Sequence, residues 1–185
     1  IPLGLEFRMA PGWKIYWRTP GEAGLPPSIN LEQNFNDALS VHVAWPAPKR
    51  FDAFGFDNFG YADHVVLPLR LTGHTSGTPL QLTADVEALV CADICVPLAG
   101  TLDLDLLDTA TLPTIHTQMI AEYASSVPRA GTAPNINVQA LWHDTENLYI
   151  QFSATTVPLD DIFIEGIDGV AFKKPMMNGQ IDRIA

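Results

Sequence analysis

The sequence predicts an all-β protein built as a β-sandwich. Short segments in which apolar and polar residues alternate recur along the chain, as expected for strands with one buried face. Turns rich in glycine and proline separate these segments, and the chain holds 13 Gly and 15 Pro. Because little of the first part has helical spacing, its strands are expected to bury their apolar faces against one another in two sheets.

The expected strands are short and follow one another closely, at residues 3–9, 13–17, 39–45, 65–71, 80–87 and 101–106. Residues 18–27 are rich in proline and glycine and are expected to form an ordered loop or an irregular edge. Pro68 interrupts one strand. This predicts an edge position or a bulge there, because proline donates no hydrogen bond to a ladder.

From Leu112 the pattern changes. Ile115, Met119 and Tyr123 have helical spacing, with a proline near the first turn, so a short helix and a linker are expected. Strand patterning resumes at 136–142, 148–152 and 162–166. About 50 residues are few for an independent core, so this part is interpreted as the start of a second β-sandwich domain. The predicted division is 1–111, 112–134 and 135–185.

The composition excludes some classes of partner. The formal net charge is −11 with only 10 basic residues, which argues against binding of nucleic acid or of an anionic membrane surface. No run of 18 apolar residues occurs, so no membrane-spanning helix is expected. The chain begins without Met or a leader pattern, and we expect it to be part of a longer protein. The many prolines and few lysines suit a secreted or periplasmic β-protein.

Cys91 and Cys95 are the only cysteines of the chain and the best indication of its function. A strand would hold their Cα atoms roughly 13 Å apart, too far for a disulfide. Alternating segments flank the pair, and Pro97 and Gly100 follow it, so we place the pair on a turn or strand end between two strands. Two thiols so close in sequence can form a disulfide with each other and so carry two electrons.

Three interpretations of the pair remain open: a structural staple, a redox-active disulfide and a thiolate metal site. A small ring removes little chain entropy, which weakens the first. Two thiolates suit Cu(I), and Met9, His42 or His64 could complete such a site, although none of them is near the pair in sequence. We favour the redox pair and expect no cofactor and no metal.

An aromatic segment follows the third expected strand. Residues 50–61 fit neither strand nor helix spacing and are expected to form a loop. Such a loop could cover a disulfide and control access to it. The candidate shielding residues are Phe51, Phe54, Phe56 and Tyr61.

Several motifs, in this order and spacing, resemble the N-terminal periplasmic domain of DsbD-type thiol–disulfide interchange proteins, and most closely their ScsB branch, which is associated with suppression of copper sensitivity. They lie within residues 12–24, 45–51, 60–69 and 91–97, and the resemblance covers roughly residues 3–107. Residues 136–185 resemble the start of the second β-domain of that branch. Three residues separate the cysteines here, whereas five separate them in the DsbD relatives.

The resemblance implies an immunoglobulin-like sandwich in the periplasm, at the N-terminal end of an inner-membrane protein. It implies that a thioredoxin-like domain of the same membrane protein reduces the pair, which then reduces periplasmic thioredoxin-fold proteins. Cys95 would form the mixed disulfide with a partner and Cys91 would resolve it. A cap loop with a Phe, here around residues 51–56, would shield the pair.

The sequence around the pair offers no activating cation. No Lys, Arg or His lies within five residues of either cysteine, whereas Glu87 and Asp93 do, and carboxylates oppose thiolate formation. Tyr16, Tyr61 and His64 are candidates that the fold could bring to the sulfurs. We expect much of the reactivity to come from a low-pKa cysteine of the partner.

Overall fold

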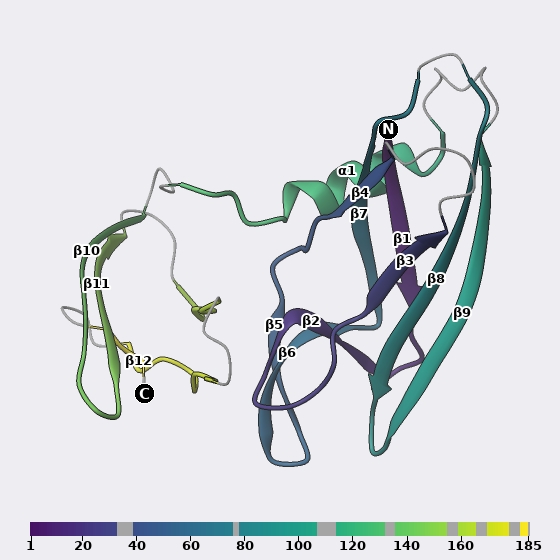
Figure 1. The fold of residues 1–185 in the computed structure, drawn as a ribbon. Helices are drawn as coiled ribbons and strands as arrows, with labels where there is room; N and C mark the ends of the chain where they lie inside the picture. The colour runs from purple at the N-terminus through teal and green to yellow at the C-terminus, as the bar shows by residue number, and fades with distance from the viewer. Residues whose placement is uncertain are drawn as a thin grey trace. The chain divides into compact units, whose positions relative to one another are not determined.

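The computed structural model describes residues 1–32, 39–75, 78–106, 114–131, 136–154, 159–165, 170–177 and 182–184. The chain divides into two compact units, Ile1–Pro128 and Arg129–Ala185. The first unit contains both cysteines and two antiparallel sheets (Figure 1). No helix in the described ranges is long and apolar enough to cross a membrane.

The smaller sheet has the order β1-β7-β4, and the larger sheet has the order β3-β8-β2-β6-β5, with β9 paired to β8. The smaller sheet consists of β1 (Pro2–Arg8), β4 (Ser40–Val43) and β7 (His64–Thr72). The larger consists of β2 (Lys14–Gly21), β3 (Ser28–Glu32), β5 (Lys49–Ala53), β6 (Phe56–Ala62), β8 (Leu80–Cys91) and β9 (Cys95–Leu106).

Apolar side chains from both sheets form the core. Leu71 of β7 clusters with Leu80 and Leu82 of β8, which joins the smaller sheet to the larger one. Ile15 of β2 and Leu67 of β7 are fully buried. The first unit is therefore the immunoglobulin-like β-sandwich that the sequence predicts.

Pro68 is neither on an edge strand nor at a bulge in the described pairing, so that prediction is wrong. Strand β7 lies between β1 and β4, and Pro68 is opposite Gly4 of β1. Its carbonyl oxygen accepts a hydrogen bond from the Ala44 amide at 2.8 Å, one residue beyond the end of β4. In an antiparallel strand, the backbone N and O of one residue point to the same neighbouring strand. The Pro68 nitrogen therefore faces β4, at the point where the pairing of β4 with β7 ends. The missing donor is tolerated there.

Strand β2 extends further than expected, through Gly21 into the segment interpreted as a loop. Its pairing with β6 is irregular between Tyr16 and Gly21, which explains why alternation fails there.

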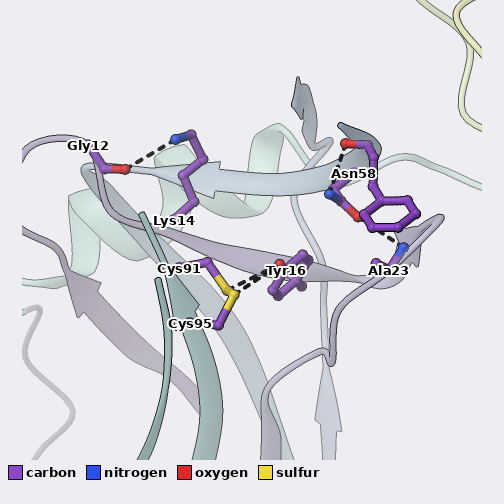
Figure 2. The surroundings of a disulfide bond; sticks show 8 residues. Gly12, Lys14, Tyr16, Ala23, Asn58, Cys91 and Cys95 are labelled. Atoms are coloured by element: carbon purple, nitrogen blue, oxygen red, sulfur yellow. Dashed lines mark hydrogen bonds between the residues drawn. A yellow bond between two sulfur atoms is a disulfide. The ribbon is translucent and has the colours of Figure 1, made fainter. Parts of the chain in front are cut away.

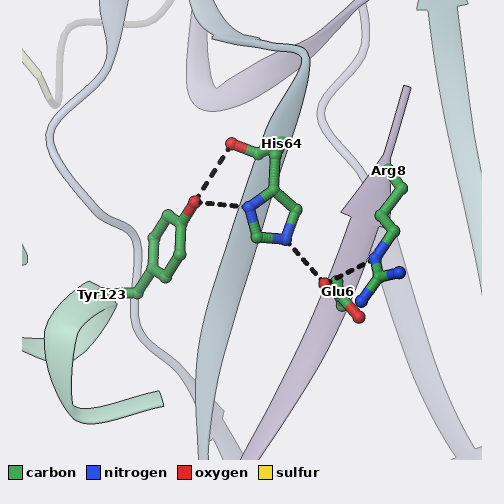
Figure 3. A network of polar contacts seen from close by, with 4 residues as sticks. All are labelled: Glu6, Arg8, His64 and Tyr123. Atoms are coloured by element: carbon green, nitrogen blue, oxygen red, sulfur yellow. Dashed lines mark hydrogen bonds and ion pairs between the residues drawn. The ribbon is translucent and has the colours of Figure 1, made fainter. Parts of the chain in front are cut away.

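The predicted short helix is α1 (Thr117–Ser125), and it belongs to the first unit. The Tyr123 hydroxyl lies 2.9 Å from His64 Nδ1 and 3.2 Å from the His64 carbonyl oxygen (Figure 3). His64 Nε2 in turn lies 2.6 Å from a Glu6 oxygen, which also accepts a hydrogen bond from Arg8 at 2.8 Å. The Arg8 hydrogen bond, followed by that of His64, lowers the pKa of Glu6. This network ties the helix to β7 and β1.

The second unit contains a three-stranded antiparallel sheet in the order β10-β11-β12. Its strands are β10 (Ile136–His143), β11 (Leu148–Ala154) and β12 (Asp182–Ile184). The two strands expected at 136–142 and 148–152 are confirmed. The third prediction is wrong, because residues 162–165 form no strand; position 166 lies outside the described residues.

Candidate redox site

Cys91 is the last residue of β8 and Cys95 is the first residue of β9. The two strands pair without a register shift from Leu80↔Leu106 to Cys91↔Cys95, so the ladder itself places the cysteines opposite each other. Their Cα atoms are 4.1 Å apart and their sulfurs form a disulfide. The predicted position at a turn between two strands is confirmed.

The two sulfurs have different surroundings. Cys91 is 1% exposed, whereas Cys95 is an exposed residue. The reason is topological. The end of β8 lies beside β2, with Cys91 opposite Lys14, while β9 is paired on its β8 side only in the described part of the chain. An attacking thiol can therefore approach Cys95 from solvent, whereas Cys91 is covered.

Tyr16 of β2 is the side chain that reaches the disulfide. Its hydroxyl donates a hydrogen bond to Cys91 Sγ at 3.2 Å and lies 4.0 Å from Cys95 Sγ (Figure 2). The ring is 2% exposed, and burial raises the pKa of its phenol. Tyr16 therefore keeps its proton at neutral pH and remains a hydrogen-bond donor to the buried sulfur.

Gly24 makes room for the Tyr16 ring, and Gly60 makes room for the neighbouring Phe51 ring. A Cβ atom on Gly24 would lie 2.2 Å from the ring, and Gly24 has a φ of +105° that favours glycine. A Cβ atom on Gly60 would lie 2.0 Å from the Ile15 oxygen and 3.0 Å from Phe51 Cε1. Phe51 thus packs over Gly60, and its ring centroid is 5.8 Å from that of Tyr16.

The aromatic segment is a β-hairpin and not a loop, so the expected loop is wrong. Strands β5 and β6 pair from Lys49↔Gly60 to Ala53↔Phe56, and Phe54 and Gly55 form a two-residue turn with φ of 58° and 81°. Alternation is missing because residues 58–61 of β6 are all buried, as happens when both faces of a strand are covered.

The four candidate shielding residues occupy different places on this hairpin. Phe51 is partly buried beside Tyr16, whereas Phe54 and Phe56 lie at the turn with exposed fractions of 59% and 48%. Tyr61 is buried, and its hydroxyl donates to the Pro46 carbonyl oxygen at 2.7 Å. Of the four, Phe51 is the one in a described contact with a residue that touches the disulfide.

Lys14 is the functional candidate that the sequence did not reveal. It is opposite Cys91 in the β2–β8 ladder, a pairing between residues 77 positions apart (91 minus 14). Its ammonium donates to the Gly12 carbonyl oxygen at 3.1 Å and lies 5.5 Å from the Phe51 ring centroid, and Figure 2 shows the side chain directed toward Gly12. The fold therefore brings a lysine that is remote in sequence opposite Cys91 in the ladder, with its ammonium held at the Gly12 carbonyl oxygen.

A second residue missed from the sequence is Asn58, which is fully buried. Its side chain accepts a hydrogen bond from the Ala23 amide at 3.0 Å and donates one to the Phe56 carbonyl oxygen at 3.0 Å. It thereby fixes the chain that leads to Gly24 against β6. A lone Asn in an aromatic segment carries no sequence signal for this role.

Of the three candidate activators, Tyr16 alone has a described contact with a sulfur. Tyr61 is bonded to Pro46, and the ring nitrogens of His64 lie beside Glu6 and Tyr123. Within the described ranges, no group of three or more His, Cys, Asp or Glu side chains is arranged to hold a metal ion.

Fold and site together define a class: an immunoglobulin-like sandwich that carries an accessible disulfide between adjacent strand ends. The family of the N-terminal domain of the thiol:disulfide interchange protein DsbD matches residues 1–106, and the chain belongs to this family. The solved N-terminal periplasmic domain of ScsB from Proteus mirabilis is similar, with a TM-score of 0.77 and 26% identity over 99% of this chain and 71% of that one. No curated protein matches the sequence closely enough to count as a relative.

Proposed function

We propose that this protein exchanges thiols and disulfides through Cys91 and Cys95, relaying electrons from a thioredoxin-like donor to partner proteins. Membership of the DsbD N-terminal family supports exchange chemistry in general. The observation that carries the specific proposal is the difference in exposure of the two cysteine residues, 1% for Cys91 against an exposed Cys95. Exchange requires access to one sulfur, and the other must then leave as a thiolate.

The reduction step follows from this geometry. A donor thiolate attacks Cys95 Sγ, the S–S bond breaks, and its electron pair passes to Cys91 Sγ. The second thiolate of the donor then attacks its own sulfur in the mixed disulfide and releases the Cys95 thiolate. Two electrons have moved to the pair, and the donor is left as a disulfide. The protons that the donor thiols lost to solvent on becoming thiolates are balanced by those that Cys91 and Cys95 take up from solvent. Transfer to a partner runs the same steps in reverse, with Cys95 attacking and Cys91 resolving.

Tyr16 is suited to assist this step. Its hydroxyl is a donor 3.2 Å from Cys91 Sγ, the atom that becomes the leaving thiolate. Hydrogen bonds to charged groups are roughly twice as strong as neutral ones, so this contact strengthens as the S–S bond breaks.

The partners are proposed from the family. The donor would be a thioredoxin-like domain of the same membrane protein, and the acceptors would be periplasmic thioredoxin-fold proteins. The related ScsB domain is described as N-terminal and periplasmic, which supports a periplasmic location for this chain. We assign the exchange to residues 1–111, and treat 112–134 as helix and linker and 135–185 as part of a second β-domain.

For the shield, we propose Phe51 rather than the exposed Phe54 and Phe56 or the inward Tyr61. Phe51→Ala is expected to speed reduction of the disulfide by a small thiol such as dithiothreitol, because removing the ring opens the site around Tyr16. Phe54→Ala is the matched control at the hairpin turn and should leave the rate unchanged. Equal rates for both variants would rule Phe51 out as the shield.

The reduction potential tests the proposed function against its alternatives. In a glutathione series, the relay predicts a potential in the range of exchange proteins, roughly −120 to −270 mV. A value below about −300 mV would instead favour an inert staple. The measurement is repeated with Cu(I). Tight stoichiometric binding by the reduced protein, with poor exchange against a thioredoxin-like donor, would favour a copper-binding module.

A further inference from the structure

Strand β9 has a free edge beside the redox site. It pairs with β8 along its whole length, from Cys95 to Leu106, and is at the margin of the larger sheet in Figure 1. Across the described ranges no strand pairs with its other side. A free edge presents unpaired backbone donors and acceptors to any extended chain that approaches it.

One face of β9 carries an uncovered apolar row. Val96, Leu98, Leu102 and Leu104 are between 38% and 50% exposed. Their cross-strand neighbours on β8 include Leu82 and Ala88, which are 8% and 7% exposed. The row therefore lies on the same face of the sheet as the buried core residues of β8, but it is not itself covered by the core. Gly100 is in the middle of the row, and a Cβ atom there would touch nothing within 4 Å.

The opposite face of the same hairpin is acidic. Residues 80–106 contain no Lys, Arg or His, and they include Asp85, Glu87, Asp93, Asp103 and Asp105. Thr83 donates to Asp103 at 2.8 Å and Thr101 donates to Asp85 at 2.6 Å, so two of these carboxylates are oriented by hydroxyl groups of the neighbouring strand. A cation would find fixed acceptors on this face.

The two faces decide what kind of chain fits the edge. Edge strands are commonly protected by lysines, prolines or bulges. Pro97 lies at the cysteine end of β9, but from Leu98 to Leu106 the strand has neither lysine nor proline, and its ladder with β8 has no register shift. A second copy of this chain would bring further aspartates beside Asp103 and Asp105, against an overall charge of −11. A basic partner strand would instead be attracted by the carboxylates of Asp103 and Asp105. Its alternate apolar side chains would cover the exposed leucines.

We propose that the free edge of β9 binds an extended segment of a partner protein in which basic and apolar residues alternate, and that this segment adds to the sheet as a further strand. Backbone hydrogen bonds to β9 would provide affinity, and the alternate side chains would provide specificity. Binding of this kind needs no exchange at Cys91 and Cys95. The test therefore uses the oxidised full chain and a peptide without cysteine, so that failure of the relay and failure of this site are distinguishable.

The probe is a short peptide with blocked ends in which lysine and valine alternate. Its binding is measured by NMR titration, and we expect saturable amide shifts concentrated in residues 98–106. A peptide of the same composition with its lysines and valines in separate blocks should bind much more weakly, because it cannot direct both kinds of side chain to opposite faces. Added salt should weaken binding of the alternating peptide.

Variants of β9 complete the test. Asp103→Asn with Asp105→Asn should weaken binding about fivefold or more while leaving the apolar row intact. Gly100→Lys projects a cation into open space and should weaken binding by more than about tenfold, since it repels the peptide and covers the row. Ile115→Lys is the control, because it adds the same charge outside the hairpin at a residue that is 90% exposed. This variant should bind the alternating peptide as tightly as the parent protein does.

Three outcomes would overturn the proposal. One is the absence of saturable binding at millimolar peptide. Another is equal binding of the alternating and block peptides, which would mean attraction by net charge alone. The third is concentration-dependent self-association of the chain through β9 that excludes the peptide, which would make a second copy the occupant.

Discussion

At the scale of single residues, the disulfide is asymmetric in both access and hydrogen bonding. Cys95 is exposed, while Cys91 is buried and accepts the Tyr16 hydrogen bond at 3.2 Å. Attack at Cys95 therefore directs the developing charge to the sulfur that already has a donor. In the proposed mechanism, this arrangement makes Cys91 the leaving group.

Tyr16→Phe tests that assignment. The variant keeps the ring but removes the donor, so reduction of the disulfide by a thioredoxin-like donor should slow roughly tenfold, the effect of losing one hydrogen bond to a charged group. The pKa of the Cys91 thiol should rise for the same reason, measurable from the pH dependence of alkylation in a Cys95→Ser background. Tyr61→Phe removes another buried hydroxyl, one bonded to Pro46, and should leave the rate unchanged. A rate for Tyr16→Phe equal to that of the parent would contradict the role of the hydroxyl.

At the scale of elements, the pairing of the strands determines where the residues of the redox site lie. Only part of this arrangement can be predicted from the local sequence. The turn between β8 and β9 was predictable because alternating segments at 80–87 and 101–106 flank the cysteines and because proline and glycine follow Cys95. Tyr16 could be named as a candidate but not placed. The approach of Tyr16 and Lys14 to Cys91 depends on the β2–β8 register, which is a long-range pairing.

The hairpin β5–β6 shows why the remaining part was missed. Its turn is Phe54-Gly55, whereas Asn-Gly is the usual sequence signal for this kind of turn. Its second strand also lacks alternation, because Asn58, Phe59, Gly60 and Tyr61 are all buried. A period-two pattern arises only when one face of a strand meets solvent.

The β10–β11 hairpin of the second unit carries a pH-dependent turn. Asp144 accepts hydrogen bonds from the amides of Glu146 and Asn147 and from the Tyr149 hydroxyl, at 2.7 to 2.8 Å. These bonds, that of the Glu146 amide first, lower the pKa of Asp144 from 3.8 to about 2. A lowered carboxyl pKa stabilises the folded turn above pH 3.8, and this contribution is lost as the pH falls toward 2.

Carboxyl NMR shifts should therefore report a midpoint near 2 for Asp144. In Asp144→Ala, the amides of Glu146 and Asn147 should exchange faster with solvent at pH 5, because they lose their acceptor. The loss should be smaller in Asp144→Asn, which keeps an amide oxygen at that place. Unchanged exchange in both variants would show that the turn is held by other contacts.

At the scale of the whole molecule, a relay must remain folded in both redox states. The cysteines are separated by 4 positions in the sequence, and closing so small a ring stabilises a protein by only about 2 kcal/mol. The bond joins β8 and β9, two strands of the same sheet, and does not link the two sheets. Urea unfolding of the chain with and without a reductant should therefore give two cooperative transitions, with the reduced form less stable by about 2 kcal/mol or less. Loss of the folded state on reduction would indicate a structural staple.

The central claim is that Cys95 is the sulfur that partners attack and Cys91 is the one that leaves. It is tested most directly with a thioredoxin-like donor that lacks its resolving cysteine and whose remaining cysteine is activated as a mixed disulfide with thionitrobenzoate. The reduced variants Cys91→Ser and Cys95→Ser are each mixed with this donor, and formation of the protein mixed disulfide releases thionitrobenzoate. The account predicts a stable mixed disulfide with Cys91→Ser, which retains the exposed sulfur, and little or none with Cys95→Ser. Equal trapping by the two variants, or trapping by Cys95→Ser alone, would contradict it.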